Sequence, residues 1–534
     1  MKPQLVPGTR ALALPKHPHV LRVFPHGKEL TAKPDMVFVR HGVAETRLLR
    51  RLNATIPCPL ETHYRWPRKP WQAQQATASM LAMHRRAYVL NEMGTGKTFT
   101  TLAAADFLMD ENEIQRALIV APVSTLGPTW QKEILQWFPH RSAVVLHGTA
   151  AKRRQLLAEK HDFYLINHDG VEILIDELTK RRDIGLIVFD ELAVYRNGRP
   201  GKGRDGKIKH RLFFFAQKLV VDRNYVWGLT GAPCPNEPLD AWAQVRLITP
   251  SRVPSWWTDF RDQVMTKVGT YTWLPKAGAM ETVYQVMQPA VRFSLQECAD
   301  LPEIIEETRD ATLSPTQRKA YQTMMDAVQR NIAIDDATGK PHFIDQAHAA
   351  VQHQKLMQIA CGWVYDDQHK VVHLNPKDRL SVLKDMVDST SQKVLVFVPF
   401  LHVLDGVAAF LRKHGITCET ISSKTTLPKR NDIFDRFQHR TDPRALVAHP
   451  KTMSHGLTLT AANVIVWFAP PSSYDTYLQA NRRIRRPGQA HSQVLVHLSG
   501  TPVEARTYHR LRKRGNALDA LLGLFASGTP GDDP

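Results

Sequence analysis

Residues 91–98 read Asn91-Glu92-Met93-Gly94-Thr95-Gly96-Lys97-Thr98 and lie between an apolar run and a helix-forming stretch. The run before them, residues 86–90, is typical of a buried strand, and residues 98–105 favour a helix. A strand, a glycine-rich turn and a helix in this order form the context of a P-loop, which binds phosphate groups. The glycines allow close backbone approach, and the helix N-terminus attracts negative charge. The stretch therefore predicts a nucleotide-binding parallel sheet.

Within this loop we expect Lys97 to contact the β- and γ-phosphates of ATP and Thr98 to bind Mg²⁺. The long pattern G-x-x-x-x-G-K-[ST] is not met, because Asn91 stands where its first glycine belongs. The alternative, a glycine-rich turn arising by chance, is disfavoured by the Lys-Thr pair and by the flanking segments. The loop residues assigned to ATP binding are Met93, Gly94, Thr95, Gly96, Lys97 and Thr98.

A pair of carboxylates follows a second apolar run, residues 184–189. Asp190 and Glu191 come directly after this expected strand, at the end where a parallel sheet binds ligands. We expect Asp190 to join Thr98 in binding Mg²⁺, and Glu191 to orient the attacking water. The alternative is a solvated helix cap, and the phosphate loop upstream argues against it.

Four arginines lie in a third stretch, residues 479–489, which reads Gln-Ala-Asn-Arg-Arg-Ile-Arg-Arg-Pro-Gly-Gln. Arg483 and Arg486 are spaced i, i+3, one helical turn apart. Arginines with this spacing could stabilise charge on a transferred phosphoryl group, or they could form a basic surface that contacts phosphate backbone.

Composition indicates a partner for the chain. Its 534 residues carry a formal net charge of +19, and the pI is about 9.7. Such a basic balance favours a polyanion, most commonly nucleic acid. The five cysteines show no C-x-x-C spacing, and neither a signal peptide nor an apolar stretch of membrane-spanning length is evident. We expect a cytoplasmic protein, in bacteria or in a phage-infected host, without a membrane partner.

The apolar pattern alternates between strands and helices in two separate parts of the chain. Strands are expected at residues 86–90, 116–122, 163–167, 184–189 and 226–231, and again at 393–398, 444–448, 464–468 and 493–498. Between these parts we expect helices over residues 315–332 and 344–361. The expected fold is α/β, with two RecA-like, doubly wound parallel-sheet lobes. The expected domains are an N-terminal accessory region (1–64), lobe 1 (65–250), a helical lobe-joining insertion (251–375), lobe 2 (376–515) and a disordered tail (516–534).

With these motifs placed, residues 65–512 resemble superfamily II helicases, and within them the compact Swi/Snf-like DNA-dependent ATPases of phages and bacteria. The arginine-rich stretch 479–489 is similar to motif VI of that family. This resemblance implies that Arg483 and Arg486 are catalytic arginine fingers, and that Arg482 and Arg485, which fall outside the fixed positions of the motif, belong to a basic surface. Four further segments are similar to the Q motif (70–77), motif Ia (121–126), motif III (229–236) and motif V (454–459).

The resemblance implies further site residues. Gln74 is the expected adenine contact, with Gln72 as the competing register. The nucleic-acid track is expected to include Ser124, Thr125, Asn167 and Thr230. One departure from the family concerns the residues after Asp190-Glu191, where Leu192-Ala193 replaces an ending in histidine. That replacement leaves open how ATP hydrolysis is coupled to movement.

The resemblance also implies the activity, an ATP-dependent translocase or helicase that acts on DNA, duplex or forked. An RNA helicase of the same superfamily and a clamp that binds ATP and DNA without turnover are the alternatives. Protein partners stay open, and the sequence is compatible with a monomer. A basic, glycine-rich stretch at residues 197–211 is either a solvated loop or a DNA-backbone contact.

Overall fold

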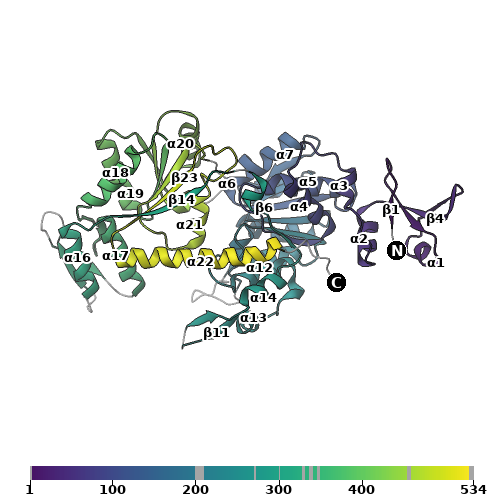
Figure 1. Cartoon of the computed structure of the whole chain (residues 1–534), viewed down its shortest axis with the longest axis horizontal. Helices are drawn as coiled ribbons and strands as arrows, with labels where there is room; N and C mark the ends of the chain where they lie inside the picture. The colour runs from purple at the N-terminus through teal and green to yellow at the C-terminus, as the bar shows by residue number, and fades with distance from the viewer. Residues whose placement is uncertain are drawn as a thin grey trace. The chain divides into compact units, whose positions relative to one another are not determined.

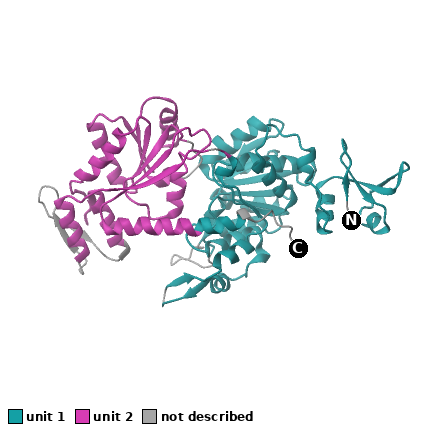
Figure 2. Cartoon of the chain, in the orientation of Figure 1, with its two compact units in different colours: residues 1–298, 518–534 teal, residues 299–517 magenta. Residues whose placement is uncertain are grey.

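The structure is a computed structural model that describes residues 3–198, 210–269, 272–299, 301–326, 331–335, 341–345, 349–453 and 459–527. The chain forms two compact units: residues 1–298 with 518–534 make unit 1, and residues 299–517 make unit 2 (Figure 2). Each unit contains a parallel β-sheet flanked by helices (Figure 1). This arrangement confirms the predicted two RecA-like lobes.

Unit 1 is built on a seven-stranded sheet in the order β13-β5-β10-β9-β6-β8-β7. Every neighbouring pair is parallel, so all the carboxyl ends lie at one edge of the sheet. Ligands of doubly wound sheets bind at this edge. The strands are β5 (Arg86–Val89), β6 (Arg116–Ala121), β7 (Ala143–Val145), β8 (Phe163–Asn167), β9 (Ile184–Asp190), β10 (Tyr225–Leu229) and β13 (Ala290–Val291).

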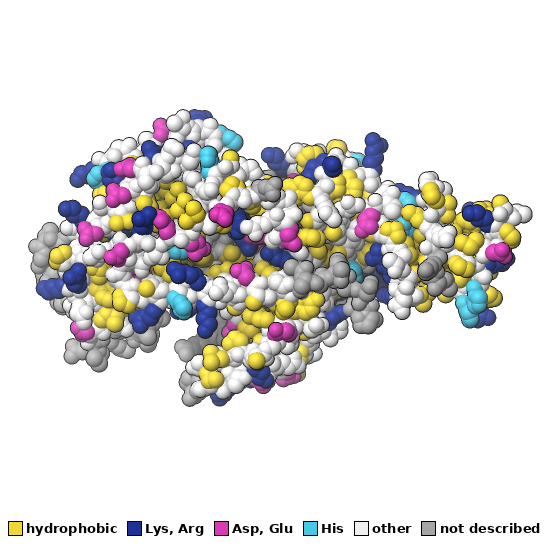
Figure 3. All heavy atoms as spheres, in the orientation of Figure 1, with side chains coloured by type: hydrophobic (Ala, Val, Ile, Leu, Met, Phe, Trp, Pro, Cys, Tyr) yellow, Lys and Arg dark blue, Asp and Glu magenta, His cyan; other side chains and the backbone are white. Residues whose placement is uncertain are grey.

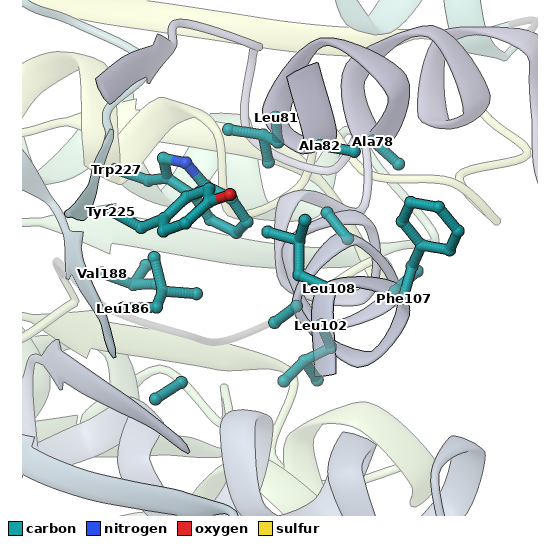
Figure 4. Close-up of a cluster of buried hydrophobic side chains, with 14 of the residues drawn as sticks. Ala78, Leu81, Ala82, Leu102, Phe107, Leu108, Leu186, Val188, Tyr225 and Trp227 are labelled. Atoms are coloured by element: carbon teal, nitrogen blue, oxygen red, sulfur yellow. The ribbon is translucent and has the colours of Figure 1, made fainter. Parts of the chain in front are cut away.

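The core of unit 1 lies between this sheet and two helices, α4 (Gln72–Met83) and α5 (Lys97–Asp110). Figure 4 shows Leu81 and Leu108 from these helices beside Val188 and Trp227 from the sheet. Helix α5 is buried almost all round, as its run of apolar and small residues predicts. The packing holds the phosphate loop between β5 and α5 on a rigid base. The other longer helices of the unit are α7 (Lys132–Trp137), α8 (Ala150–Ala158), α11 (Arg211–Val220) and α12 (Asp240–Ile248).

The N-terminal region forms a small antiparallel sheet in the order β1-β2-β4-β3. It has its own apolar cluster, in which Leu12 and Leu14 pack with Val37 and Val39. The apolar run Met36–Val39 lies in β4. The elements are β1 (Gln4–Leu5), β2 (Ala11–Pro15), α1 (Pro18–Val23), β3 (Lys28–Leu30), β4 (Lys33–Arg40), α2 (Val43–Arg51) and α3 (Pro59–His63).

Residues 251–298 belong to unit 1, although the sequence placed them in a lobe-joining insertion. They contain a short hairpin as well as helices, and strand β13 pairs with β5 at the edge of the main sheet. A two-residue edge strand has too few side chains to give a readable period, so the sequence could not place it. The elements are α13 (Trp257–Val264), β11 (Met265–Lys267), β12 (Trp273–Pro275), α14 (Ala279–Val286) and α15 (Leu295–Cys298).

Unit 2 has a six-stranded parallel sheet in the order β14-β23-β22-β19-β21-β20. Its first strand, β14, comes from the expected insertion and pairs along its whole length with β23. The strands are β14 (Ile304–Asp310), β19 (Lys393–Phe397), β20 (Cys418–Ile421), β21 (Ala445–Ala448), β22 (Ala462–Trp467) and β23 (Gln493–Ser499), and the helices include α18 (Lys377–Asp388), α19 (Leu401–Lys413), α20 (Leu427–His439) and α21 (Tyr474–Asn481).

Two helices expected before lobe 2 are present but shorter than predicted. They are α16 (Pro315–Asp326) and α17 (Ala349–Cys361). Residues between them instead pair as the antiparallel strands β15 (Asn331–Asp335) and β16 (Pro341–Asp345). The alternation of isoleucine with other residues in 331–335 fits a strand better than a helix turn. A further short pair, β17 (Trp363–Tyr365) and β18 (Val371–His373), follows α17.

The expected disordered tail is wrong for residues 516–527. Helix α22 runs from Pro502 to Ser527. Its last turns bury Leu518, Leu521 and Phe525, which lie at i, i+3 and i+7 on one helix face. The Phe525 ring packs against Tyr284 of unit 1, with ring centroids 4.8 Å apart. Burial of this apolar face keeps the segment helical. Among the described residues, no helix combines the length and the apolar character that crossing a bilayer requires.

Candidate nucleotide-binding site

The phosphate loop follows β5 and turns sharply into α5. Gly94 and Gly96 have φ values of 91° and 79°, a left-handed conformation that glycine adopts without strain. Gly96 is also the N-cap of α5, so backbone N–H groups at the start of this helix are available to an anion. The local geometry is that of an anion-binding turn on a helix N-terminus.

Lys97 folds back over this loop. Its ammonium Nζ donates to the carbonyl oxygens of Asn91 at 2.8 Å and Glu92 at 3.2 Å. Thr95 braces the same turn, because its hydroxyl donates to the Glu92 carbonyl at 2.8 Å. The cation is therefore held at the loop that the sequence predicts for phosphates. Thr98, one residue further on, is partly exposed in the first turn of α5.

Asn91 replaces the first glycine of the long P-loop pattern, and the structure gives a reason for it. Its side chain donates to the Thr77 hydroxyl at 2.9 Å and accepts the Phe293 backbone N–H at 2.9 Å. Next to it, a Glu92 carboxylate oxygen accepts the Leu295 N–H at 2.9 Å. The loop is thus tied on one side to α4 and on the other to the segment after β13. Glycine could not make these side-chain bonds.

Gln74 lies beneath the loop and is 2% exposed. Its amide nitrogen donates to the Thr95 carbonyl at 3.1 Å, and its amide oxygen accepts the Trp71 N–H at 3.1 Å. A Cβ on Gly96 would collide with the Gln74 amide, which explains why this position needs glycine. Both ends of Gln74 thus hold the loop. The competing residue, Gln72, is exposed at the start of α4.

Asp190 and Glu191 stand at the end of β9. Strand β10 separates β9 from β5, so the carboxylates and the phosphate loop lie at the same edge of the sheet, two strands apart. Glu191 has a φ of 55°, an uncommon conformation for a residue with a side chain and one that recurs at functional sites. Burial raises the pKa of the Asp190 carboxyl, while a hydrogen bond from Trp130 and the charge of Lys97 lower it.

The contact between Trp130 and Asp190 was not predicted from the sequence. The Trp130 indole N–H donates to Asp190 Oδ2 at 3.0 Å, and the other carboxylate oxygen, Oδ1, accepts the Glu191 backbone N–H at 3.1 Å. The two residues are 60 positions apart in the chain, so no local pattern indicated the pair. Trp130 lies four residues beyond the segment that is similar to motif Ia (121–126).

The oxygen donors at this edge suit Mg²⁺. Mg²⁺ prefers oxygen ligands and is usually bound through one or two protein groups, with phosphate and water completing the shell. The Asp190 carboxylate and the Thr98 hydroxyl are donors of this kind. A divalent cation would also stabilise the ionised form of Asp190, which burial disfavours. Within the described part of the chain, no cluster of three or more His, Cys, Asp or Glu side chains offers a different metal site.

Thr230 lies between the two catalytic strand ends, not on a surface. It follows β10, is 1% exposed, and its backbone N–H donates to the Val89 carbonyl at 3.0 Å. Its hydroxyl accepts the Ala232 N–H at 3.2 Å and so stabilises the turn after the strand. This burial leaves Thr230 inaccessible to nucleic acid in this structure, so we remove it from the proposed contacts.

The other predicted nucleic-acid residues follow the neighbouring strands β6 and β8. Ser124 and Thr125 form the short helix α6 (Val123–Thr125), in which Ser124 is partly exposed and Val123 is 61% exposed. Asn167 is partly exposed at the end of β8, where its side-chain oxygen accepts a hydrogen bond from Arg153 Nη1 at 3.0 Å. These residues share one edge of the sheet because β6 and β8 are parallel neighbours.

In unit 2, Arg483 and Arg486 differ in exposure. Helix α21 ends at Asn481, so both arginines lie in the turns after it and not along a helix, as their spacing had suggested. Pro487 and Gly488 follow directly and favour such an ending. Arg483 is 1% exposed, and its Nε donates to the Gln479 carbonyl at 3.1 Å. Arg486 is partly exposed.

Two predicted features fall outside the described residues. They are most of motif V, residues 454–458, and most of the basic stretch, residues 199–209. On the face shown in Figure 3, Lys and Arg side chains are spread over both units and interspersed with Asp and Glu. The net charge of +19 is therefore not gathered into a single patch on that face.

Two family models match the chain. A model of the SNF2-related domain matches residues 74–360, and a model of the helicase conserved C-terminal domain matches residues 378–488. A solved structure, the Sulfolobus solfataricus SWI2/SNF2 ATPase core in complex with dsDNA, is 19% identical, with a TM-score of 0.40; the match covers 87% of this chain and 96% of that one.

Three relatives show the spread of similar proteins. The chain is 22% identical to the SWI/SNF-related matrix-associated actin-dependent regulator of chromatin subfamily A-like protein 1 of Drosophila melanogaster, over 86% of this chain and 56% of that protein. Putative protein p41 of Acyrthosiphon pisum secondary endosymbiont phage 1 is 25% identical, over 76% of this chain and 86% of the phage protein. An uncharacterized ATP-dependent helicase of Mycoplasma genitalium is 24% identical, over 78% of this chain and 38% of the mycoplasma protein.

The chain thus spans little more than half of the fly relative and less than half of the mycoplasma relative. The SNF2-related match alone covers more than half of the 534 residues. It includes the phosphate loop and the Asp190-Glu191 pair, and the second match includes Arg483 and Arg486. The chain belongs to the SNF2-related family of helicase-like ATPases.

Proposed function

We propose that this protein hydrolyses ATP in response to DNA and uses the energy to move along duplex DNA. The main support is the placement of Lys97 and the Asp190-Glu191 pair at one edge of the unit 1 sheet, in a chain of the SNF2-related family. Phosphoryl transfer depends on positioning and charge stabilisation, and this edge offers both.

In the proposed reaction, each group at this edge has one task. Lys97 leaves its loop carbonyls to contact the β- and γ-phosphates, and the N–H groups of the Gly94–Gly96 turn bind phosphate oxygens. Glu191 orients the attacking water. Thr98 and Asp190 would hold Mg²⁺, which would supply positive charge beside the phosphates. Gln72 contacts the base, while Gln74 keeps the loop in shape.

Unit 2 supplies positive charge for the transition state. Arg486 is the principal candidate, because it is partly exposed, whereas Arg483 is buried and donates to backbone within its own unit. Removal of the γ-phosphate would change the contacts that bound nucleotide makes. In nucleotide-driven switches, such a loss moves segments or domains. Repeated cycles would then give stepwise movement on DNA.

DNA is the proposed polymer for two reasons. The chain carries a net charge of +19, and one relative is named a regulator of chromatin and another an ATP-dependent helicase. Ser124 and Asn167 are the proposed contacts, because they follow adjacent strands and are partly exposed, whereas the predicted contact Thr125 is buried. Contacts of this kind would be made to phosphates, so we expect little dependence on base sequence.

The proposal is tested by ATPase rates measured with no nucleic acid, single-stranded DNA, duplex DNA, forked DNA and RNA. We expect the largest stimulation with duplex or forked DNA. Lys97→Ala should abolish turnover with every polymer, because the phosphates lose their point charge. Lys160→Ala, at an exposed lysine of the same unit, is the matched control and should hydrolyse ATP normally. Stimulation by RNA alone, or normal turnover by Lys97→Ala, would contradict the proposal.

A further inference from the structure

One hydrogen bond links the segment expected to contact DNA with the carboxylate expected to bind Mg²⁺. The Trp130 indole N–H donates to Asp190 Oδ2 at 3.0 Å. Trp130 is fully buried, and an indole has a single donor, so this contact uses the whole hydrogen-bonding capacity of the side chain. The remaining carboxylate oxygen, Oδ1, accepts the Glu191 N–H. The orientation of the carboxyl plane is therefore fixed from two sides.

Trp130 sits in an unusual element. Residues Leu126–Gln131 form a π-helical turn, η1, between α6 and α7. π-Helical turns are rare, and they occur frequently at functional sites. Here the turn contains Gly127 and Pro128, and proline lacks the N–H that a regular α-helix would use.

The same short segment reaches from the surface to the site. At its outer end Val123 is 61% exposed and Ser124 is partly exposed, whereas Trp130 is fully buried against Asp190. Thr125 anchors the start of the segment, since its hydroxyl and its N–H both contact the Pro122 carbonyl at 2.9 Å. A displacement of α6 by a phosphate backbone would be carried through η1 to the indole, because no flexible linker separates them.

We propose that Trp130 is a positioning residue that couples DNA binding at Ser124 to the orientation of the Asp190 carboxylate. This inference rests on the proposed DNA-stimulated ATPase activity. When DNA contacts α6, the indole N–H holds Oδ2 in the orientation that serves Mg²⁺ and the phosphates. By reciprocity, nucleotide bound with Mg²⁺ should strengthen DNA binding through the same contact.

The simpler explanation is that Asp190 only provides a hydrogen-bond acceptor for the N–H of a buried indole. Buried tryptophans usually find a partner for the N–H group, and that role would be structural. The two explanations differ in what depends on the hydrogen bond. A structural role affects stability and leaves the response to DNA intact, whereas a coupling role affects the response itself.

The test replaces the N–H without changing the ring shape. β-(3-Benzothienyl)alanine, which carries sulfur in place of the indole N–H, is incorporated at position 130 of the full chain. The same analogue at position 137 is the matched control, because Trp137 lies in the adjacent α7 and its ring contacts Phe99, 6.2 Å between centroids. Trp130→Phe serves as a second variant. Thermal unfolding of each protein checks that it folds.

Two ratios are measured on each protein. The first is kcat with duplex DNA divided by kcat without it. The second is duplex affinity with Mg²⁺ and a non-hydrolysable ATP analogue, divided by affinity without nucleotide. The analogue at 130 should lower the first ratio at least about tenfold, the loss expected for one hydrogen bond to a charged acceptor. It should also bring the second ratio close to one, while KM for ATP measured without DNA changes less than about threefold.

Unchanged ratios for the analogue at 130, or an equal loss for the analogue at 137, would overturn the coupling role. Failure of the proposed function is seen separately, before any substitution is made. If duplex DNA does not stimulate the unmodified protein, the DNA-dependent activity is wrong and the coupling inference falls with it.

Discussion

Arg483 and Arg486 hold equivalent places in one motif but differ in burial, so their substitution should have different effects. Arg486→Ala should lower kcat by about 10³-fold, as loss of an arginine finger does, with ATP affinity nearly unchanged. Arg483→Ala should instead destabilise unit 2, because Arg483 is 1% exposed and its Nε bonds to backbone. Steady-state ATPase rates and thermal unfolding separate the two effects.

Arg440→Ala, at an exposed arginine of the same unit, is the control and should change neither property. A normal hydrolysis rate for Arg486→Ala would show that this residue is no finger.

The ionised Glu133 carboxylate lowers the free energy of unfolding, and the size of this effect depends on pH. It lies in the first turn of α7, burial raises the pKa of its carboxyl to about 7, and the nearby Arg68 charge lowers it only in part. One carboxylate oxygen has no hydrogen-bond partner. A raised folded-state pKa means that the charged form destabilises the fold. This loss of folding stability is absent below pH 4.5, where the carboxyl is protonated in both states, and reaches its full size above about pH 7.

Glu133→Gln should therefore raise the stability of the protein at pH 8, by up to about 3 kcal/mol, and should change it little at pH 5. Urea unfolding at the two pH values measures the difference. Glu281→Gln, at an exposed glutamate of the same unit, is the control and should show no such dependence. An equal effect of Glu133→Gln at both pH values would show that the carboxyl is ionised without penalty.

Among single residues, the sequence predicted those whose position is determined by a local pattern. Lys97, Thr98 and Asp190 were placed because a glycine-rich turn and a strand end can be recognised within about ten residues. The contacts of Trp130 with Asp190 and of Asn91 with Phe293 were not predicted, since they join residues 60 and 202 positions apart. The burial of Thr230 depends on its neighbouring strands, which a motif does not reveal.

Two helices of unit 2, α18 and α22, are joined by a buried ion pair. Arg379 Nη2 and Glu504 Oε1 are 2.7 Å apart, and their side chains are 1% and 0% exposed. Glu504 Oε2 also accepts hydrogen bonds from the Gly500 N–H and the Thr501 hydroxyl, both at 3.0 Å. The pair therefore fixes the start of α22 against the sheet of unit 2.

Arg379→Ala should destabilise unit 2 by about 3–5 kcal/mol, because Glu504 is left as an unpaired buried charge. Replacing both residues by apolar ones, Arg379→Met with Glu504→Leu, should recover at least half of that loss. Amide hydrogen exchange in β19 and β22 measures the stability of the unit directly. A double variant less stable than Arg379→Ala alone would show that the pair is net stabilising.

Elements were predictable in proportion to their length and burial. The central strands of both sheets are continuous apolar runs, and the sequence located all nine of those it named. The edge strands β7, β13 and β20 have two to four residues, too few for a period. Strand β14 was missed for a different reason: its residues are mostly charged and exposed, so its pairing with β23 leaves no apolar pattern. The end of α22 was missed because its apolar face follows a strongly basic stretch.

At the scale of the whole molecule, each unit has its own sheet and its own apolar core. Unit 1 contains the groups proposed to bind ATP and Mg²⁺, and unit 2 contains the arginines proposed to assist hydrolysis. A motor that draws on two such units can turn a change in nucleotide into movement between them. We propose that repeated movements of this kind carry the protein along duplex DNA.

Triplex displacement tests that claim most directly. A third strand bound to one end of a duplex is released when a protein translocates through it, without separation of the duplex strands. We predict ATP-dependent release by the unmodified protein and none by Lys97→Ala, with weak strand separation on a tailed duplex. Robust unwinding of the tailed duplex with no triplex displacement would contradict the duplex-translocation account and would indicate a strand-separating helicase.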